Sequence, residues 1–123
     1  MQLAHGIHLA YCTNVHRGGN WSETFASLEQ DVLRVRDAVA GEEPYAIGLR
    51  LGWDAAKELS TDETLSSFRR WLDEENCYVF TINGFPYGNF HGTRVKEQVY
   101  RPDWTSPDRL AYTNLLFDLL VEL

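Results

Sequence analysis

The sequence predicts an α/β protein built as a parallel βαβαβα module. Three short apolar runs, at 7–12, 45–51 and 78–82, alternate with segments in which apolar residues recur at helical spacing. Strands that alternate with helices in this way pair in parallel and are joined by right-handed connections. The length of 123 residues suits one domain, and neither a linker nor an internal repeat divides it. We therefore expect a single domain over residues 1–123, made of about three βα units.

The first unit begins with the predicted strand at 7–12, followed by a glycine-containing loop at 13–19. Asn20 is the predicted N-cap of the next helix, and Glu23 stands at the capping-box position. Gly41 is suited to end this helix. Its predicted core face consists of Phe25, Leu28, Val32, Val35 and Val39.

The second unit starts with the strand at 45–51, which is apolar apart from Arg50. A short helix is predicted at 53–59. Ser60 and Glu63 form a capping-box pattern for another helix, whose apolar face is Leu65, Phe68 and Leu72.

The third strand is predicted to begin at Tyr78, and a long polar loop follows it. Ser106 then caps the last helix and Pro107 opens it. This helix is apolar on more than one side over 115–121, so we expect it to be buried on several sides. Three parallel strands also leave two open sheet edges. The module is therefore either the first part of a larger barrel, which we favour, or a self-associating unit.

The composition narrows the class of protein. Apolar residues make up 44% and charged residues 24%, which is typical of a folded domain. A net charge of −7 argues against nonspecific nucleic-acid binding, which depends on basic residues. No apolar run approaches the roughly 20 residues of a membrane span, and no basic segment marks a signal peptide. Cys12 and Cys77 are expected to be buried and reduced. Reduced cysteines, together with the lack of an apolar span and of a signal peptide in this sequence, predict a cytoplasmic protein.

The third strand runs directly into the main candidate site. Ligands of α/β proteins bind where the carboxyl ends of parallel strands meet their loops. Asn83 ends this strand, and its amide either binds a substrate hydroxyl or forms an Asx turn before Gly84. His91, in the same loop, is the candidate catalytic residue, because histidine exchanges protons near neutral pH; it can also simply anchor the loop.

Four further residues of this loop are candidates for substrate binding. Lys96 and Glu97 either contact an anionic or hydroxylated ligand or form a local ion-pair network. Tyr100 and Trp104 either stack on a sugar or aromatic ligand or hold the loop in place.

Residues after the first two strands complete the predicted rim. Asn14 and His16 follow the first strand, so they would share an edge with the loop residues. Arg50 lies in a buried strand, where a charge needs a partner. We expect Arg50 either to face the barrel interior and pair with a carboxylate or to contact a ligand directly. His5 and His8 would point to opposite faces of a strand, so no metal site is predicted there.

Several motifs taken together resemble one family. TINGFPYG at 81–88, FHGTRVKE at 90–97 and VYRPDW at 99–104 are similar to the EboE-type metabolite traffic proteins. YCTNVH at 11–16 and GLRL at 48–51 resemble the family's first two strand ends. The resemblance extends over nearly the whole chain.

The resemblance implies a xylose-isomerase-like TIM barrel, related to sugar isomerases and epimerases. A complete (β/α)₈ barrel takes about 250 residues, so this chain would supply about three of its eight units. In those relatives, Glu, Asp and His from later strands hold a divalent metal, of the Mn²⁺, Mg²⁺ or Zn²⁺ type. Those positions have no counterpart here, so no cofactor is expected in this chain.

The expected function is a contribution of substrate-side loops to a pocket for a sugar-like or polyol-like metabolite. Isomerase or epimerase chemistry would need the complete barrel, and this chain alone is expected to be inactive. Two alternatives remain open: a non-catalytic metabolite-binding or carrier protein, and a subunit module that assembles through its open sheet edge, with itself or with another chain.

Overall fold

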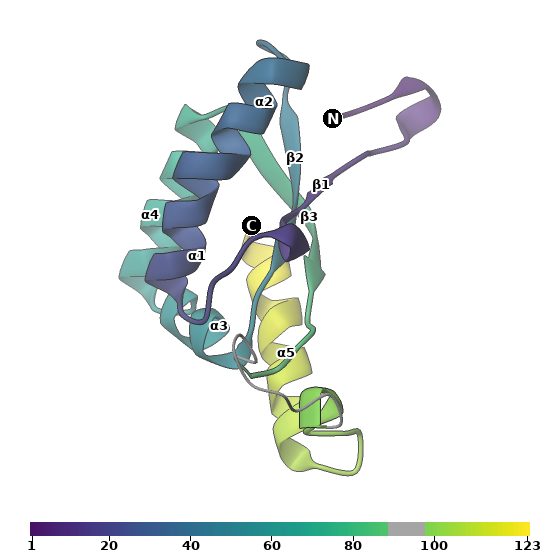
Figure 1. Cartoon of the computed structure of the whole chain (residues 1–123), viewed down its shortest axis with the longest axis vertical. Coiled ribbons are helices and arrows are strands. Elements are labelled where there is room, and N and C mark those ends of the chain that lie inside the picture. The colour runs from purple at the N-terminus through teal and green to yellow at the C-terminus, as the bar shows by residue number, and fades with distance from the viewer. Residues whose placement is uncertain (89–97) are drawn as a thin grey trace.

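A three-stranded parallel sheet organises the chain. The computed structural model describes residues 1–88 and 98–123. The strands β1 (Tyr11–Cys12), β2 (Tyr45–Arg50) and β3 (Cys77–Asn83) lie in the order β1-β2-β3. Both pairings are parallel, and helices pack against the sheet (Figure 1). The predicted α/β class and parallel sheet are confirmed, whereas membership of a barrel stays a prediction.

The first strand is much shorter than predicted. Instead of a strand at 7–12, the first nine residues form a small hairpin in which Gln2 pairs with His8 in antiparallel fashion. His5 and Gly6 make the turn, with φ angles of 65° and 71°. Two consecutive residues with positive φ reverse the chain tightly, so only Tyr11–Cys12 remains to pair with β2.

The first long helix is confirmed, and it contains a π-helical turn. Helix α1 (Trp21–Ser27) continues through the π-turn Leu28–Val32 into α2 (Leu33–Val39). Asn20 Oδ1 accepts a hydrogen bond from the backbone N–H of Glu23 at 2.8 Å, as the capping pattern predicts. The extra residue in a π-turn rotates the helix that follows. This rotation explains why Val39, predicted for the core face, is 62% exposed.

The middle of the chain forms two helices, with a different cap from the predicted one. Helix α3 (Trp53–Leu59) has the expected bounds, and α4 (Asp62–Glu74) follows it. The N-cap of α4 is Thr61, whose hydroxyl accepts from the N–H of Thr64, whereas Ser60 closes α3. The predicted N-cap, Ser60, was therefore wrong by one residue, because Ser60 is the C-cap of α3.

The core lies between the sheet and the helices. Trp21 from α1 and Phe68 from α4 are both buried, with ring centroids 4.8 Å apart. Tyr45, Ile47 and Leu49 of β2 are fully buried beneath these helices. Arg36 of α2 adds a clamp at the edge of this core, donating to both the backbone and the carboxylate of Glu75 at 2.7 Å.

The last helix, α5 (Pro107–Glu122), packs beside β3 and α3. Ser106 caps it and Pro107 opens it, as predicted. Tyr112 is fully buried, and its hydroxyl donates to the backbone carbonyl of Leu51. A Cβ at Gly84 would lie 2.6 Å from Leu116 Cδ1, so the glycine allows α5 to approach the end of β3 closely.

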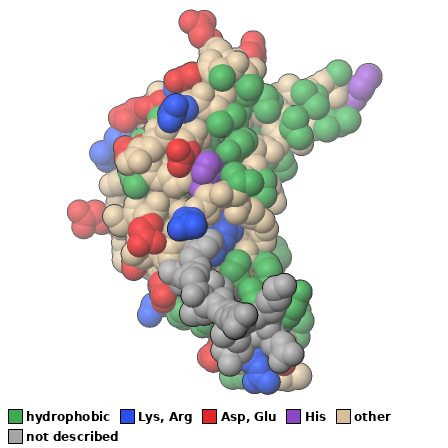
Figure 2. Space-filling model, in the orientation of Figure 1, with side chains coloured by type: hydrophobic (Ala, Val, Ile, Leu, Met, Phe, Trp, Pro, Cys, Tyr) green, Lys and Arg blue, Asp and Glu red, His purple; other side chains and the backbone are tan. Residues whose placement is uncertain are grey.

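One face of the sheet is much less covered than the other. Figure 2 shows charged side chains over the helices and hydrophobic ones along the sheet and the N-terminal hairpin. On β3, Val79 is buried against the core while Phe80 is 41% exposed. Cys12 is exposed too, contrary to the prediction, because the strand that would bury it on both sides is only two residues long. Cys77 is buried as predicted, and burial raises the pKa of its thiol.

Candidate functional site

The carboxyl ends of the three strands meet at one edge of the sheet, where the candidate site was expected. Arg50 and Asn83 are register partners at the ends of β2 and β3. Paired residues in a parallel sheet project to the same face, so both side chains leave β2 and β3 on the face opposite Leu49 and Ile82. The neighbouring pair, Cys12 and Gly48, joins the end of β1 to the same edge.

Arg50 is held by the loop that follows β1. Its backbone N–H donates to Thr13 Oγ1 at 2.8 Å, and its Nη1 donates to the Gly18 carbonyl at 3.0 Å. Within residues 1–88 and 98–123, no carboxylate forms an ion pair with it, so the predicted carboxylate partner is replaced there by a backbone carbonyl. Burial lowers the pKa of Arg50, while the nearby Tyr112 acts in the opposite direction.

Gly18 makes this arrangement possible. A Cβ at Gly18 would lie 2.7 Å from Thr24 Oγ1 and 3.2 Å from the Thr24 backbone. A side chain at position 18 would push the loop away from α1, so the glycine favours the close approach that presents the Gly18 carbonyl to Arg50. The loop between β1 and α1 is thus fastened to the end of β2.

His16 lies in the same loop, and both of its ring nitrogens have partners. Nε2 is 2.9 Å from the hydroxyl of Tyr11, and Nδ1 is 3.5 Å from Asp31 Oδ2. Asn14 is exposed at the same edge. His16 and Asn14 were predicted to share a rim with Asn83; the structure places His16 beside Arg50, where it serves to hold the loop.

The pocket beside Arg50 in the described part of the chain is small. The pocket lined by Thr13, His16, Gly18 and Arg50, together with residues of α1 and the π-turn, has a volume of about 10 Å³. Such a volume accommodates about one water molecule. This pocket between the β1–α1 loop and the end of β2 therefore has no room for a metabolite.

The end of β3 is open by comparison. A groove of about 250 Å³ lies between the end of β3 and one side of α5. Asn83 and Trp104, both predicted to bind substrate, line this groove. Its remaining walls are Ile82, Gly84, Phe85, Arg109, Thr113, Leu116, Phe117 and Leu120.

Arg109 is a groove residue that the sequence reasoning missed. Its guanidinium carbon lies 5.0 Å from the ring centroid of Trp104 and 5.6 Å from that of Tyr112. The signal was in the sequence: Arg109, Thr113, Leu116, Phe117 and Leu120 recur at helical spacing, and all of them line the groove.

The other predicted loop residues divide into two groups. Tyr100 is 72% exposed and its ring centroid is 5.7 Å from that of Phe85, while Trp104 is 69% exposed. Both aromatic rings therefore retain large accessible surfaces near the end of β3. His91, Lys96 and Glu97 lie outside the described residues.

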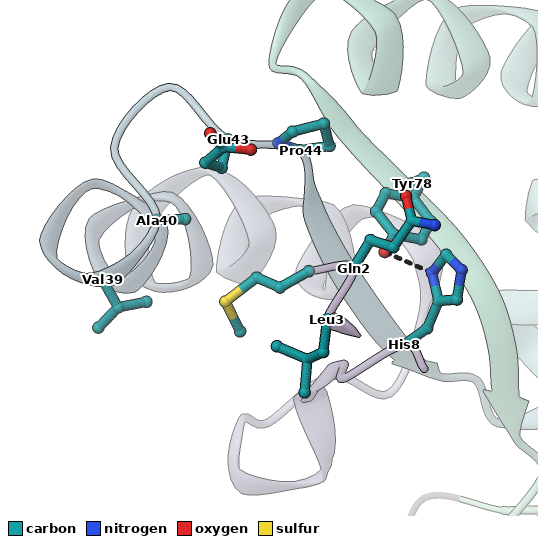
Figure 3. A pocket seen from close by; sticks show the side chains of 9 residues that line it. Gln2, Leu3, His8, Val39, Ala40, Glu43, Pro44 and Tyr78 are labelled. Atoms are coloured by element: carbon teal, nitrogen blue, oxygen red, sulfur yellow. Dashed lines mark hydrogen bonds between the residues drawn. The ribbon is translucent and has the colours of Figure 1, made fainter. Parts of the chain in front are cut away.

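A larger pocket lies at the opposite end of the sheet. It has a volume of about 730 Å³ and lies between the N-terminal hairpin and the end of α2, lined by Leu3, His8, Val39 and Glu43 among others (Figure 3). His8 Nδ1 is 2.8 Å from the hydroxyl of Tyr78, which ties the hairpin to β3. This pocket adjoins the amino ends of the strands. Ligands of parallel α/β folds bind at the opposite, carboxyl ends of the strands.

No metal centre is assembled in the described part of the chain. Residues 1–88 and 98–123 contain no group of three or more His, Cys, Asp or Glu side chains placed to hold an ion. His5 and His8 were expected to lie on one strand. Instead, His5 lies in the hairpin turn and His8 contacts Tyr78. No helix in the same residues is long and apolar enough to cross a membrane.

The fold and the groove define an α/β module with an open ligand-sized groove at the end of its third parallel strand. In comparisons with protein-family models, curated proteins and solved structures, nothing matches the chain.

Proposed function

We propose that this chain forms one sector of a (β/α) barrel and binds a small metabolite at the carboxyl end of β3. The observation that carries the proposal is the meeting of Asn83 and Trp104 in one groove of about 250 Å³. These two residues are far apart in the sequence and were each expected to contact substrate. The resemblance to EboE-type proteins, whose barrels are of the xylose-isomerase type, supports a sugar-like or polyol-like ligand.

The chemistry of the groove supports binding. The Trp104 ring offers an exposed apolar face, and such faces stack on the C–H surfaces of sugars and on aromatic ligands. The Asn83 amide offers both a donor and an acceptor for hydroxyl groups. Isomerisation or epimerisation would require the divalent metal that the resemblance assigns to later barrel strands, so this chain alone would bind without turnover.

A binding assay with this chain tests the proposal. We expect a panel of polyols, sugars and aromatic metabolites to contain at least one ligand that binds saturably in calorimetry. Asn83→Ala should weaken that binding, whereas the same change at Asn114, exposed on α5, should not. Absence of saturable binding across the panel, or equal weakening by the two variants, would contradict the proposal. Turnover by this chain with added Mn²⁺ or Mg²⁺ would overturn its non-catalytic part.

Exposed apolar surface on α5 favours a second function, as an assembly module. Leu110, Phe117 and Val121 are 56%, 63% and 84% exposed. They lie on the helix beside β3, which has no strand on its outer side in the described sheet. Apolar patches beside an open sheet edge are typical of interaction surfaces.

Sedimentation analysis distinguishes this second function from the first. Assembly predicts a concentration-dependent dimer or a stable complex, which Phe117→Glu should disrupt. A chain that stays monomeric at high concentration, with Phe117→Glu sedimenting as the unmodified chain does, would exclude assembly through this helix.

A further inference from the structure

We propose that the groove between β3 and α5 binds the carboxylate of its ligand through Arg109, so that the ligand is a small acid whose body has an apolar face. This inference rests on the proposed function, because it names the chemical class of ligand for the same groove. It adds an anchoring residue on α5 that neither the motifs nor the resemblance indicates.

Two aromatic rings lie beside the Arg109 guanidinium. Arg109 lies close to the rings of Trp104 and Tyr112, which favour the faces of a planar cation. Contacts with aromatic rings use the positive charge of the guanidinium and consume none of its N–H donors, which form the planar fork that matches a carboxylate.

Few hydrogen-bond acceptors surround Arg109 in the described part of the chain. Its one side-chain hydrogen bond in the described part of the chain is from Nη1 to the Gly84 carbonyl, at 3.5 Å, near the upper limit for such a bond. Its Nε is buried and has no hydrogen-bond partner among the described residues. In residues 1–88 and 98–123, no acidic side chain forms an ion pair with Arg109. A buried donor without an acceptor is unfavourable, which shows that the fold leaves Arg109 short of partners. A carboxylate bound at the Nη side of the guanidinium would add the acceptors that the described residues do not supply.

The size and lining of the groove limit the class of ligand that fits it. Its volume of about 250 Å³ lies below the usual range for drug-sized ligands, so the ligand is small. Apart from Arg109, Asn83 and Thr113, its lining side chains are apolar or aromatic. One cation against apolar walls selects a ligand with one acidic group and an apolar face, either an aromatic acid or a sugar acid whose C–H face stacks on Trp104.

Paired acids and neutral analogues test this inference. The probes are phenylacetate with phenylacetamide, and glucuronate with glucose, titrated by calorimetry at constant ionic strength. We expect at least one of the two acids to bind. The neutral analogue of each acid that binds should bind at least about tenfold more weakly, because a charge-assisted hydrogen bond is lost. Which acid binds more tightly shows whether the body of the ligand is aromatic or sugar-like.

Variants then locate the acid. Arg109→Gln should weaken acid binding by at least about tenfold, and Arg109→Lys should restore only part of it, because lysine keeps the charge without the planar fork. Arg70→Gln, the same change at an exposed position on α4, should have no effect. Thr113→Leu should also abolish binding, because the larger side chain fills the groove while Arg109 stays in place. This variant keeps the inference testable if the Arg109 variants fold poorly.

Three outcomes would overturn the inference, and they separate it from the proposed function. Equal binding of an acid and its neutral analogue would leave the metabolite groove standing and exclude the carboxylate anchor. Binding of none of the four probes would exclude the acid class, while the wider ligand panel decides on the groove itself. Self-association that buries Phe117 and is unaffected by the acids would show that a second copy occupies the groove.

Discussion

Two arginines near the carboxyl edge of the sheet have different surroundings. Arg50, at the end of β2, is 7% exposed, donates to the Gly18 carbonyl, and adjoins a space of about 10 Å³. Arg109, on α5, lies against two aromatic rings, has a donor without a partner in the described residues, and lines a groove of about 250 Å³. A buried cation is therefore a weak indicator of a site by itself; spare donors beside an open cavity are a stronger one.

The largest expected change in stability comes from removing Arg50, which we expect to support the fold rather than bind a ligand. Arg50→Ala should lower the free energy of unfolding by about 2–3 kcal/mol, because it removes a buried side chain and leaves the Gly18 carbonyl without its donor. Arg109→Ala should cost about 1 kcal/mol, since it removes only cation–π contacts and one long hydrogen bond. Urea unfolding of both variants measures the difference. A larger loss for Arg109→Ala would reverse the roles assigned to the two arginines.

The next effect concerns Tyr112, whose ring centroid lies 5.6 Å from the guanidinium carbon of Arg109. Tyr112→Phe should destabilise the fold by about 1–2 kcal/mol, because the buried Leu51 carbonyl loses its hydrogen bond. Tyr100→Phe, at an exposed tyrosine near the same groove, should change stability by less than about 0.5 kcal/mol. Thermal and urea unfolding would show both results, and equal effects would mean that the Tyr112 hydroxyl does not hold α5 against the sheet.

The same tyrosine predicts a dependence of stability on alkaline pH. Burial raises the pKa of Tyr112 from 10.0 to about 12. A raised pKa means that the folded state favours the protonated phenol, so the stabilisation is complete below pH 10 and is lost as pH rises through about 12. Unfolding measured across this interval should show a decline that is shallower in Tyr112→Phe. An identical decline in both proteins would contradict the assigned burial.

The smallest expected change in stability comes from Asn83, which lines the groove and does not belong to the core. The Asn83 side chain makes no hydrogen bond within the described part of the chain, and it is only partly buried. Asn83→Ala should therefore change the free energy of unfolding by less than about 0.5 kcal/mol. A loss of 1 kcal/mol or more, judged by urea unfolding, would assign Asn83 to the fold instead of the ligand groove.

The comparison also shows which parts of the structure the sequence could predict. Hydrophobic periodicity and capping residues predicted the parallel sheet, the Asn20 cap and the Pro107 start of α5, because these depend on residues close in the chain. Periodicity could not predict the hairpin turn at His5 and Gly6, since positive φ at two successive residues leaves little pattern in this sequence. The π-turn at Leu28–Val32 likewise changed which side of the helix faces the core.

The candidate site was predictable only in part, for a related reason. Asn83 was found because it ends a strand, and Trp104 because it is an aromatic residue in a polar segment. Arg109 was missed because its partners, the Trp104 ring and the Gly84 carbonyl, come together only when α5 packs against the end of β3. The partner of Arg50 was misjudged because a backbone carbonyl leaves no mark in the sequence.

A nuclear magnetic resonance titration of the labelled chain with phenylacetate and glucuronate tests whether the ligand binds at Arg109 rather than at Arg50. The Nε–H signals of Arg50 and Arg109 and the indole signal of Trp104 report on the two regions at once. We expect the Arg109 and Trp104 signals to shift saturably with the bound acid while the Arg50 signal stays in place. A shift of the Arg50 signal without a shift of the Arg109 signal, or no shift of either arginine with both acids, would contradict acid binding in the groove between β3 and α5.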